Sequence, residues 1–284
     1  MTKRVGKERL TITMRKDILS ALDQYIDGDT IRNRSHAIEY IVGRHLGAGI
    51  NTCVILASGR EDQSVKTLLR VHNRPVIAYT IELLRQANIR NIIMVINAKC
   101  PDIKRYLGNG SQWKVNIQYV EEVEPCGTAQ SLNLVRGLVK ETFLLMYGDI
   151  LVDLDLQELV RFHRDLDRAV MTLAVTGCTN PSQHGVTKLQ GSRVYNLIEK
   201  PNAYNKSNLV VAGVAVCEPK LFEFLPEKCE NKYLARDILP DLAHRGQIGG
   251  YPFDSKWFDV SHEEEYKRAQ TEWINPAESV IPSS

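Results

Sequence analysis

The chain has 284 residues, of which 43% are hydrophobic and 25% are charged, as is ordinary for a globular protein. Its net charge is +2, but residues 1–16 carry six basic side chains against the single acidic Glu8, a local excess of +5. Six cysteines without a Cys-x-x-Cys pair argue against a zinc site or a disulfide framework and favour a reducing cytoplasm. No apolar run approaches the roughly 18 residues of a membrane span, so we expect neither a signal peptide nor a membrane partner.

The first predicted elements form a small module over residues 1–48. Residues 9–14 alternate polar and apolar side chains, which predicts a half-buried strand. Apolar residues at three- and four-residue spacing then predict a helix over residues 16–26, and a second helix is expected to begin at Ser35 as its N-cap. One strand and two helices in about 40 residues cannot bury a core alone. Pairing of the strand with that of a second copy would solve this, so we expect a homodimer or a higher homo-oligomer.

This module resembles the ribbon-helix-helix fold of bacterial and archaeal repressors, including the Asn-Arg-Ser-x-Ala-Ile motif at residues 33–38. In that family the paired strands enter the major groove of duplex DNA. The resemblance implies that the DNA-facing side chains of the strand are Arg9, Thr11 and Thr13. It also implies that the helix N-terminus at Ser35, with Arg34 beside it, holds a DNA phosphate. The alternative is a dimerisation tag that never meets DNA.

Strands and helices alternate through the next part of the chain. We expect strands at 52–57, 92–96, 115–120 and 143–146, with helices at 75–87, 101–107 and 127–138 between them. This alternation predicts a three-layer α/β domain over residues 49–272 with a mostly parallel, Rossmann-like sheet. Residues 273–284 contain two prolines and two serines at the very end and are expected to form a C-terminal tail.

The strand predicted at 143–146 runs directly into Gly148 and Asp149. A carboxylate would therefore lie just past the carboxyl end of a buried strand, which is where ligands bind in open α/β sheets. A Gly-Asp pair on its own is as easily a turn, so neighbouring motifs must decide.

Eight short motifs occur in a fixed order: Leu-Ala-Ser-Gly at 56–59, Lys-Thr-Leu-Leu at 66–69, Asn-Arg-Pro-Val-Ile at 73–77, Gly-Thr-Ala at 127–129, Tyr-Gly-Asp at 147–149, Glu-Lys-Pro at 199–201, Ala-Gly-Val at 212–214 and Trp-Phe-Asp-Val at 257–260. Each is weak alone, but their order resembles that of sugar-1-phosphate nucleotidyltransferases, such as those acting on glucose 1-phosphate. These enzymes join a sugar 1-phosphate to the α-phosphate of a nucleoside triphosphate, form a nucleotide sugar and release pyrophosphate. The resemblance therefore implies these partners and Mg²⁺.

The resemblance also implies a role for each matching residue. Asp149 and Asp259 would hold Mg²⁺, and Lys66 would contact phosphate as part of the catalytic set with Asp149. The residues implied in sugar-phosphate binding are Gly148, Glu199, Lys200 and Gly213. Those implied in nucleotide binding are Leu56, Ala57, Ser58, Gly59, Gly127 and Thr128. Without the resemblance, Asp259 could cap a C-terminal element, and Glu199 with Lys200 could be an exposed ion pair.

The glycine-rich loop departs from the family pattern Leu-Ala-Gly-Gly-x-Gly-Thr-Arg-Leu. Residues 56–64 lack two of its glycines and its Thr-Arg pair, and Arg60 is the candidate replacement for the lost catalytic arginine. Glu61 and Asp62 add negative charge where a triphosphate would rest. Two hypotheses therefore remain. One is an Mg²⁺-dependent enzyme tethered to a DNA-binding module. The other is a transcriptional regulator whose nucleotidyltransferase-like domain senses a nucleotide, sugar phosphate or nucleotide sugar without turnover.

Overall fold

A computed structural model describes residues 11–26, 31–45, 49–59, 66–125, 127–201, 207–227 and 231–274. The chain divides into two compact units, Met1–Gly49 and Ile50–Ser284. Arg9 and Arg60, predicted to contact DNA and phosphate respectively, lie outside the described residues. No helix in the described ranges is long and apolar enough to cross a membrane.

The described residues of the N-terminal unit form two helices, α1 (Lys16–Asp23) and α2 (Arg34–His45). Its small core consists of Leu22, Ile31 and Ala37. The strand predicted at residues 9–14 is absent from its described part, residues 11–14, where Thr11 and Thr13 are exposed. A strand needs the backbone of a neighbouring strand to pair with, and the described residues of this unit supply none.

Helix α2 begins one residue earlier than predicted, and Ser35 is not its N-cap. The Asn33 side-chain oxygen accepts a hydrogen bond from the His36 N–H at 2.9 Å, which makes Asn33 the cap. Ser35 therefore lies inside the first turn. The guanidinium of Arg34 binds the Asp23 carboxylate through Nε and Nη2 at 2.7 and 2.8 Å, and so ties α2 to α1. This pairing lowers the pKa of Asp23.

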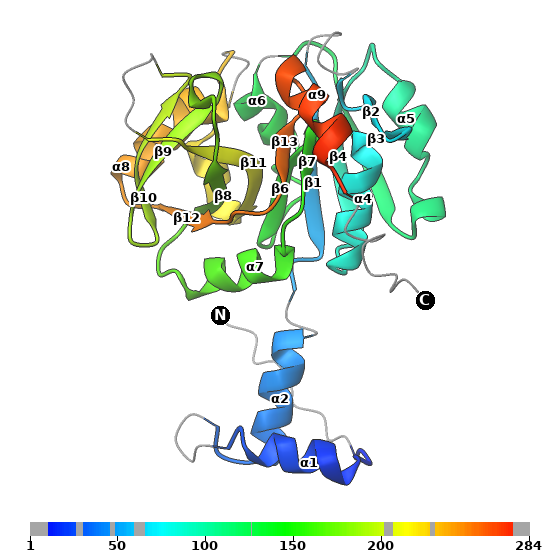
Figure 1. Cartoon of the computed structure of the whole chain (residues 1–284), viewed down its shortest axis with the longest axis vertical. Helices are drawn as coiled ribbons and strands as arrows, with labels where there is room; N and C mark the ends of the chain where they lie inside the picture. Colours follow the sequence, from blue (N-terminus) through cyan, green and yellow to red (C-terminus); the bar gives the residue numbers. More distant parts are fainter. Residues whose placement is uncertain are drawn as a thin grey trace. The chain divides into compact units, whose positions relative to one another are not determined.

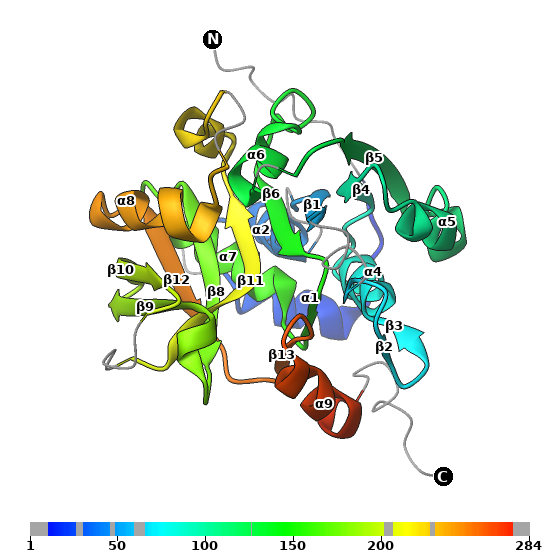
Figure 2. The ribbon, with the colours of Figure 1, turned by 90° about the horizontal axis from the view of Figure 1, so that it is seen from above.

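The large unit is built on a nine-stranded sheet of order β5-β4-β1-β6-β11-β8-β12-β10-β9 (Figures 1 and 2). The strands β5 (Asn116–Glu122), β4 (Asn91–Asn97), β1 (Thr52–Ala57) and β6 (Phe143–Tyr147) are parallel to one another. These four match the strands predicted from the sequence. In β1, β4 and β6 almost every residue is buried, which explains their uninterrupted apolar runs.

The other half of the sheet is mixed, so the prediction of a mostly parallel sheet holds only for the first four strands. β11 (Leu209–Cys217) is antiparallel to β6 and to β8 (Met171–Gly177), and β8 is parallel to β12 (Ile248–Pro252). β10 (Arg193–Glu199) and β9 (Gly185–Gln190) form a hairpin, and β9 pairs back onto β11 to close a small barrel. A two-residue connection, unlike a helical crossover, can join only antiparallel strands.

Helices cover both faces of the sheet and produce the predicted three layers. Alternate residues of β1 divide between two cores, since Cys53, Ile55 and Ala57 pack on one face and Val54 and Leu56 on the other. The helices on the first face are α4 (Val76–Gln86), α5 (Asp102–Leu107) and α7 (Leu156–Asp165). Those on the second face are α6 (Thr128–Asn133) and α8 (Leu239–His244).

The remaining elements are short. They are β2 (Arg70–Val71), β3 (Arg74–Pro75), β7 (Ile150–Val152), β13 (Trp257–Asp259), α9 (Glu263–Glu272), and the helical turns η1 (Ser111–Trp113), η2 (Pro181–Gln183), η3 (Pro219–Phe224) and η4 (Leu234–Ile238). A third core joins several of them. In it Trp273, which the sequence assigned to the tail, is buried and packs edge-on against Tyr79 at 5.7 Å between ring centroids.

Candidate functional site

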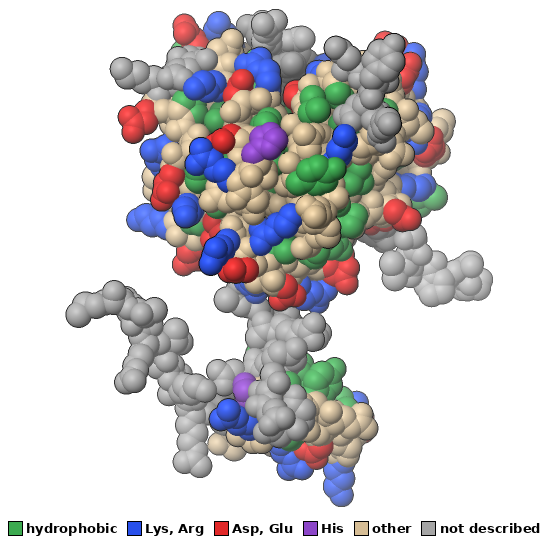
Figure 3. Space-filling view, turned by 90° about the vertical axis from the view of Figure 1, so that its left-hand side faces the viewer, with side chains coloured by type: hydrophobic (Ala, Val, Ile, Leu, Met, Phe, Trp, Pro, Cys, Tyr) green, Lys and Arg blue, Asp and Glu red, His purple; other side chains and the backbone are tan. Residues whose placement is uncertain are grey.

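A cavity of about 620 Å³ lies where the carboxyl ends of β1 and β6 face the barrel strands. Ligands bind at this edge in α/β sheets because the strands end there and leave their loops free. Several residues singled out from the sequence line the cavity: Leu56, Ala57, Ser58, Thr128, Asp149, Glu199, Lys200, Gly213 and Asp259. Basic and acidic side chains are interspersed over the face seen in Figure 3, so no charge of one sign dominates that surface.

Two short strands bring Asp149 and Asp259 together. β7 follows Asp149 directly and pairs antiparallel with β13, so that Asp259 lies opposite Ile150. The Val260 N–H donates to the Asp149 carbonyl oxygen at 3.1 Å and continues this pairing. The indole N–H of Trp257 donates to the Ala212 carbonyl oxygen at 2.8 Å, which fixes β13 against β11. Two aspartates far apart in the sequence thus face one cavity.

The environment of Asp149 disfavours its charged form. Burial raises the pKa of Asp149 well above its usual range, and the negative charge of Asp259 raises it further, while a backbone N–H and Lys66 oppose the shift. The Lys66 ammonium donates to the Ser261 carbonyl oxygen at 2.9 Å, beside Asp259. Like charges that disfavour ionisation in this way would be relieved by a bound cation.

Gly127 and Gly213 are required by the packing of the protein against itself. Their φ angles are +90° and +73°, in the region that favours glycine. A Cβ at Gly127 would lie 2.3 Å from the Lys232 carbonyl oxygen, and one at Gly213 would lie 2.8 Å from Ile150. Gly148 is also tight, since a Cβ there would be 3.1 Å from Ala57. These close contacts explain why glycine is needed at the three positions, a structural role that was not predicted from the sequence.

Glu199 ends β10, and Lys200 follows it; both line the cavity. The Lys200 N–H donates to the His184 carbonyl oxygen at 3.0 Å, which places both side chains beside β9. Burial raises the pKa of Glu199, and the positive charge of Lys200 opposes that shift. On the opposite wall the buried Ser58 hydroxyl has no hydrogen-bond partner among the described residues. A buried hydroxyl without a partner costs free energy, so a polar ligand atom there would be stabilised.

A family model for nucleotidyl transferases matches residues 38–275. The chain belongs to this family. Among its curated relatives, a probable mannose-1-phosphate guanylyltransferase of Arabidopsis thaliana is 26% identical over 228 residues, covering 76% of this chain and 67% of that protein. A glucose-1-phosphate thymidylyltransferase of Streptomyces antibioticus is 30% identical over 162 residues, covering 56% of this chain and 45% of that protein. The matches span about two thirds or less of these relatives.

Solved structures show the same fold. A UDP-glucose pyrophosphorylase complexed with UDP-glucose superposes with a TM-score of 0.64 at 21% identity, covering 78% of this chain and 97% of that one. The nucleotidyltransferase-like α/β fold, with the mixed sheet and small barrel described above, is thereby established for residues of the large unit.

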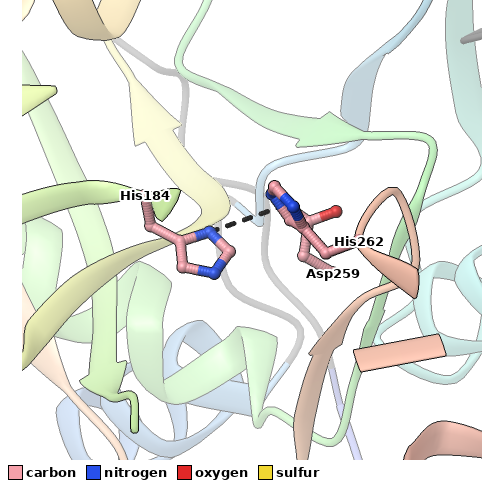
Figure 4. Close-up of side chains that lie close together, drawn as sticks. All are labelled: His184, Asp259 and His262. Atoms are coloured by element: carbon pink, nitrogen blue, oxygen red, sulfur yellow. Dashed lines mark ion pairs between the residues drawn. The ribbon is translucent and has the colours of Figure 1, made fainter. Parts of the chain in front are cut away.

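In this member of the nucleotidyl transferase family, two histidines also line the cavity, and neither was predicted from the sequence as a site residue. His184 precedes β9 and His262 precedes α9, and both rings approach Asp259 (Figure 4). Burial lowers the pKa of His184, whereas the charge of Asp259 raises it. The Asp-x-x-His spacing at 259–262 is a signal that the sequence offered, because it puts two potential ligands one turn apart. Nothing local marks His184, which reaches Asp259 only through the fold.

Proposed function

We propose that the large unit is a sugar-1-phosphate nucleotidyltransferase that binds a nucleoside triphosphate and a hexose 1-phosphate in this cavity. The observation that carries the proposal is the meeting of Asp149 and Asp259 through the β7–β13 pair, next to Lys66 and opposite Glu199 and Lys200. The curated relatives act on mannose 1-phosphate or glucose 1-phosphate, which supports a hexose as the sugar.

The proposed reaction displaces pyrophosphate from the nucleotide. A phosphate oxygen of the sugar 1-phosphate attacks the α-phosphorus, and the bond from that phosphorus to the pyrophosphate oxygen breaks. Positioning and charge neutralisation are the main contributions that a protein can make to such a transfer. The unpaired Ser58 hydroxyl is available to the nucleotide, and the Lys66 ammonium could exchange the Ser261 carbonyl for a phosphate oxygen. Glu199 and Lys200 would bind the sugar and its phosphate.

The donor set at Asp149 and Asp259 is compatible with Mg²⁺, which takes one or two carboxylates together with water and phosphate oxygens. Burial and the neighbouring charge of Asp259 both raise the pKa of Asp149, and a cation bound between the two carboxylates would oppose that shift. When bound there, Mg²⁺ would neutralise charge on the phosphates. The two aspartates would hold it, and Lys66 would add a positive charge next to them.

The alternative function is a sensor that binds the same ligands without turnover. It is favoured by residues 56–58, which line the cavity and have Ser58 where the family pattern has a glycine. The N-terminal unit fits this alternative. We propose that it dimerises and binds duplex DNA through residues 1–48, with the Ile12, Ile18 and Val42 side chains, all more than 40% exposed in the single chain, available to a second copy.

Pyrophosphate release tests the enzymatic proposal. The full chain is mixed with Mg²⁺, each nucleoside triphosphate in turn and a panel of hexose 1-phosphates. We expect release with at least one pair, and a loss of roughly 100-fold or more in Asp149→Asn. Asp167→Asn, at an exposed position, is the matched control and should keep its activity. No release with any pair, together with calorimetric binding of a nucleotide sugar, would decide for the sensor.

DNA binding is tested separately by fluorescence anisotropy of labelled duplex DNA. The full chain is compared with a chain that begins at Ile50. We expect only the full chain to bind, with an affinity that falls steeply as salt rises because phosphate contacts release counterions. Equal binding by the two chains would remove the N-terminal unit from this role.

A further inference from the structure

One corner of the cavity holds a second set of potential metal ligands, which shares only Asp259 with the predicted aspartate pair. His184, Asp259 and His262 each offer one donor atom, and all three atoms lie within 4.8 Å of one another (Figure 4). The Asp259 Oδ2 atom is 3.7 Å from His184 Nδ1 and 3.6 Å from His262 Nε2. Both distances exceed those of good hydrogen bonds, so the three groups converge without being bonded to one another.

The backbone holds each of the three side chains in place. The His184 N–H donates to the Pro181 carbonyl oxygen at 3.1 Å, and the His184 ring packs edge-on against Trp257. The Asp259 Oδ1 atom accepts the Ser261 N–H at 3.0 Å, which leaves Oδ2 directed at the histidines. The His262 N–H donates to the Asp259 carbonyl oxygen at 3.1 Å. The arrangement is therefore set by the end of β13 and by the starts of α9 and β9.

The donor separations suit a metal ion. Transition metals such as Zn²⁺ lie about 2.0–2.2 Å from imidazole nitrogen and carboxylate oxygen, which puts two donors of one tetrahedral ion roughly 3.4 Å apart. The two distances to Asp259 exceed this spacing by only a few tenths of an ångström, and the two histidine nitrogens, within 4.8 Å of each other, can be brought closer by rotation of their rings. The exposed fractions of the side chains are 7% for His184, 17% for Asp259 and 27% for His262, so the site is sheltered but open to the cavity.

The donor types indicate which ion would bind. Mg²⁺ and Ca²⁺ prefer oxygen ligands, whereas imidazole suits Zn²⁺, Co²⁺ and related ions. We propose that His184, Asp259 and His262 bind a divalent transition-metal ion of the Zn²⁺ type, with three protein ligands and an open position toward the cavity. Three protein ligands with a fourth position for water or substrate is the arrangement of catalytic rather than structural zinc sites. A phosphate oxygen of a cavity ligand could take that position.

The site shares Asp259 with the proposed magnesium pair but does not depend on turnover. Its test therefore uses metal alone, without nucleotide or sugar, and its outcome is independent of pyrophosphate release. The full chain is freed of metal with a chelator and titrated with Co²⁺, whose visible absorption reports nitrogen ligation. The affinity for Zn²⁺ is then measured by displacement of Co²⁺, and Mg²⁺ is added in excess as a competitor.

We expect one Co²⁺ per chain at this site, displaced by Zn²⁺ but not by a hundredfold excess of Mg²⁺. His262→Ala and His184→Gln should each weaken binding by at least about 10-fold, since even residues behind the ligands typically contribute that much. The partly exposed His262 makes the first variant safe for folding, and circular dichroism checks both. His244→Ala, at an exposed residue in the last turn of α8, is the control and should bind as the wild type does.

Asp149→Asn distinguishes the two metal sites. It removes a proposed magnesium ligand and leaves the histidine cluster intact, so Co²⁺ affinity should change less than about 3-fold, well below the loss expected for a ligand. Wild-type Co²⁺ binding in both folded histidine variants would overturn the proposal. So would a loss in Asp149→Asn as large as that in His262→Ala, because the ion would then belong to the aspartate pair.

Discussion

At Gly127 the chain passes so close to Lys232 that no larger residue fits. We predict that Gly127→Ala lowers the free energy of unfolding by about 2–4 kcal/mol, from roughly 1 kcal/mol of backbone strain and the rest from overpacking. Gly246→Ala is the matched control, because φ there is +66° but a Cβ would meet nothing within 4 Å. The free energy of unfolding of Gly246→Ala should fall only by the strain contribution, roughly 1 kcal/mol. Urea denaturation measures both, and equal losses would show that the contact with Lys232 is unimportant.

His163 makes stability depend on pH. Its Nδ1 atom lies 2.7 Å from the Thr172 hydroxyl, its Nε2 atom lies 3.0 Å from Glu218, and burial holds the pKa of the ring below its usual value. As pH falls below about 6.5, the unfolded chain takes up a proton that the folded protein does not. The free energy of unfolding therefore falls with pH until the pH reaches the lowered pKa.

His163→Leu tests this linkage. At pH 7.5 the variant should be less stable by about 1–3 kcal/mol, because Thr172 and Glu218 lose their partner. Between pH 7.5 and 5.5 it should then lose less stability than the wild type. Chemical denaturation at both pH values measures these losses. An equal loss of stability in the variant and the wild type would contradict this role of His163.

Single residues differed in how well the sequence predicted them. Asp149 and Asp259 were found because each lies in a short motif, and both line the cavity. Ser35 was wrongly predicted as an N-cap because Asn33, two residues earlier, is also a good capping residue. In the structure the Asn33 side chain accepts the His36 N–H and caps the helix. His184 could not be found, since its meeting with Asp259 depends on the barrel and on β13, which no local pattern encodes.

At the scale of elements, one side-chain hydrogen bond, from the Trp257 indole to the Ala212 carbonyl, ties β13 to β11. We predict that Trp257→Phe lowers the free energy of unfolding by about 1–3 kcal/mol, because the buried Ala212 carbonyl loses its donor. Trp113→Phe is the matched control, because its buried indole N–H has no hydrogen-bond partner among the described residues. It should cost less than Trp257→Phe in the same denaturant experiment. The reverse order would show that packing, not the hydrogen bond, anchors β13.

The parallel strands were predictable because β1, β4 and β6 are continuous apolar runs, β5 alternates polar and apolar residues at its start, and a helix separates each strand from the next. The barrel strands were not, since β9 and β10 expose part of each strand and follow each other through a tight turn at Gly191. Their direction is set by that turn and by pairing with distant strands. Helix α6 is also shorter than predicted and ends at Asn133, although apolar residues continue to Leu138.

The two units of the molecule have separate cores. In the described residues, Leu22, Ile31 and Ala37 form the N-terminal core, and the three larger cores contain only residues from Ile50 onward. We therefore predict that a chain beginning at Ile50 folds and unfolds in urea at the same midpoint as the large unit of the full chain. Circular dichroism and tryptophan fluorescence measure this, since all three tryptophans lie beyond residue 50. A clearly lower midpoint would show that the N-terminal unit stabilises the large one.

The pairing of β7 with β13 also sets the order in which the protein can be completed during synthesis. Asp149 leaves the ribosome long before Trp257, Asp259 and His262, so the cavity remains unfinished until residues 257–262 have emerged. The N-terminal unit, in contrast, depends on local contacts and can fold first. The proposed dimer of N-terminal units, if it forms on nascent chains, would therefore form before the cavity is complete.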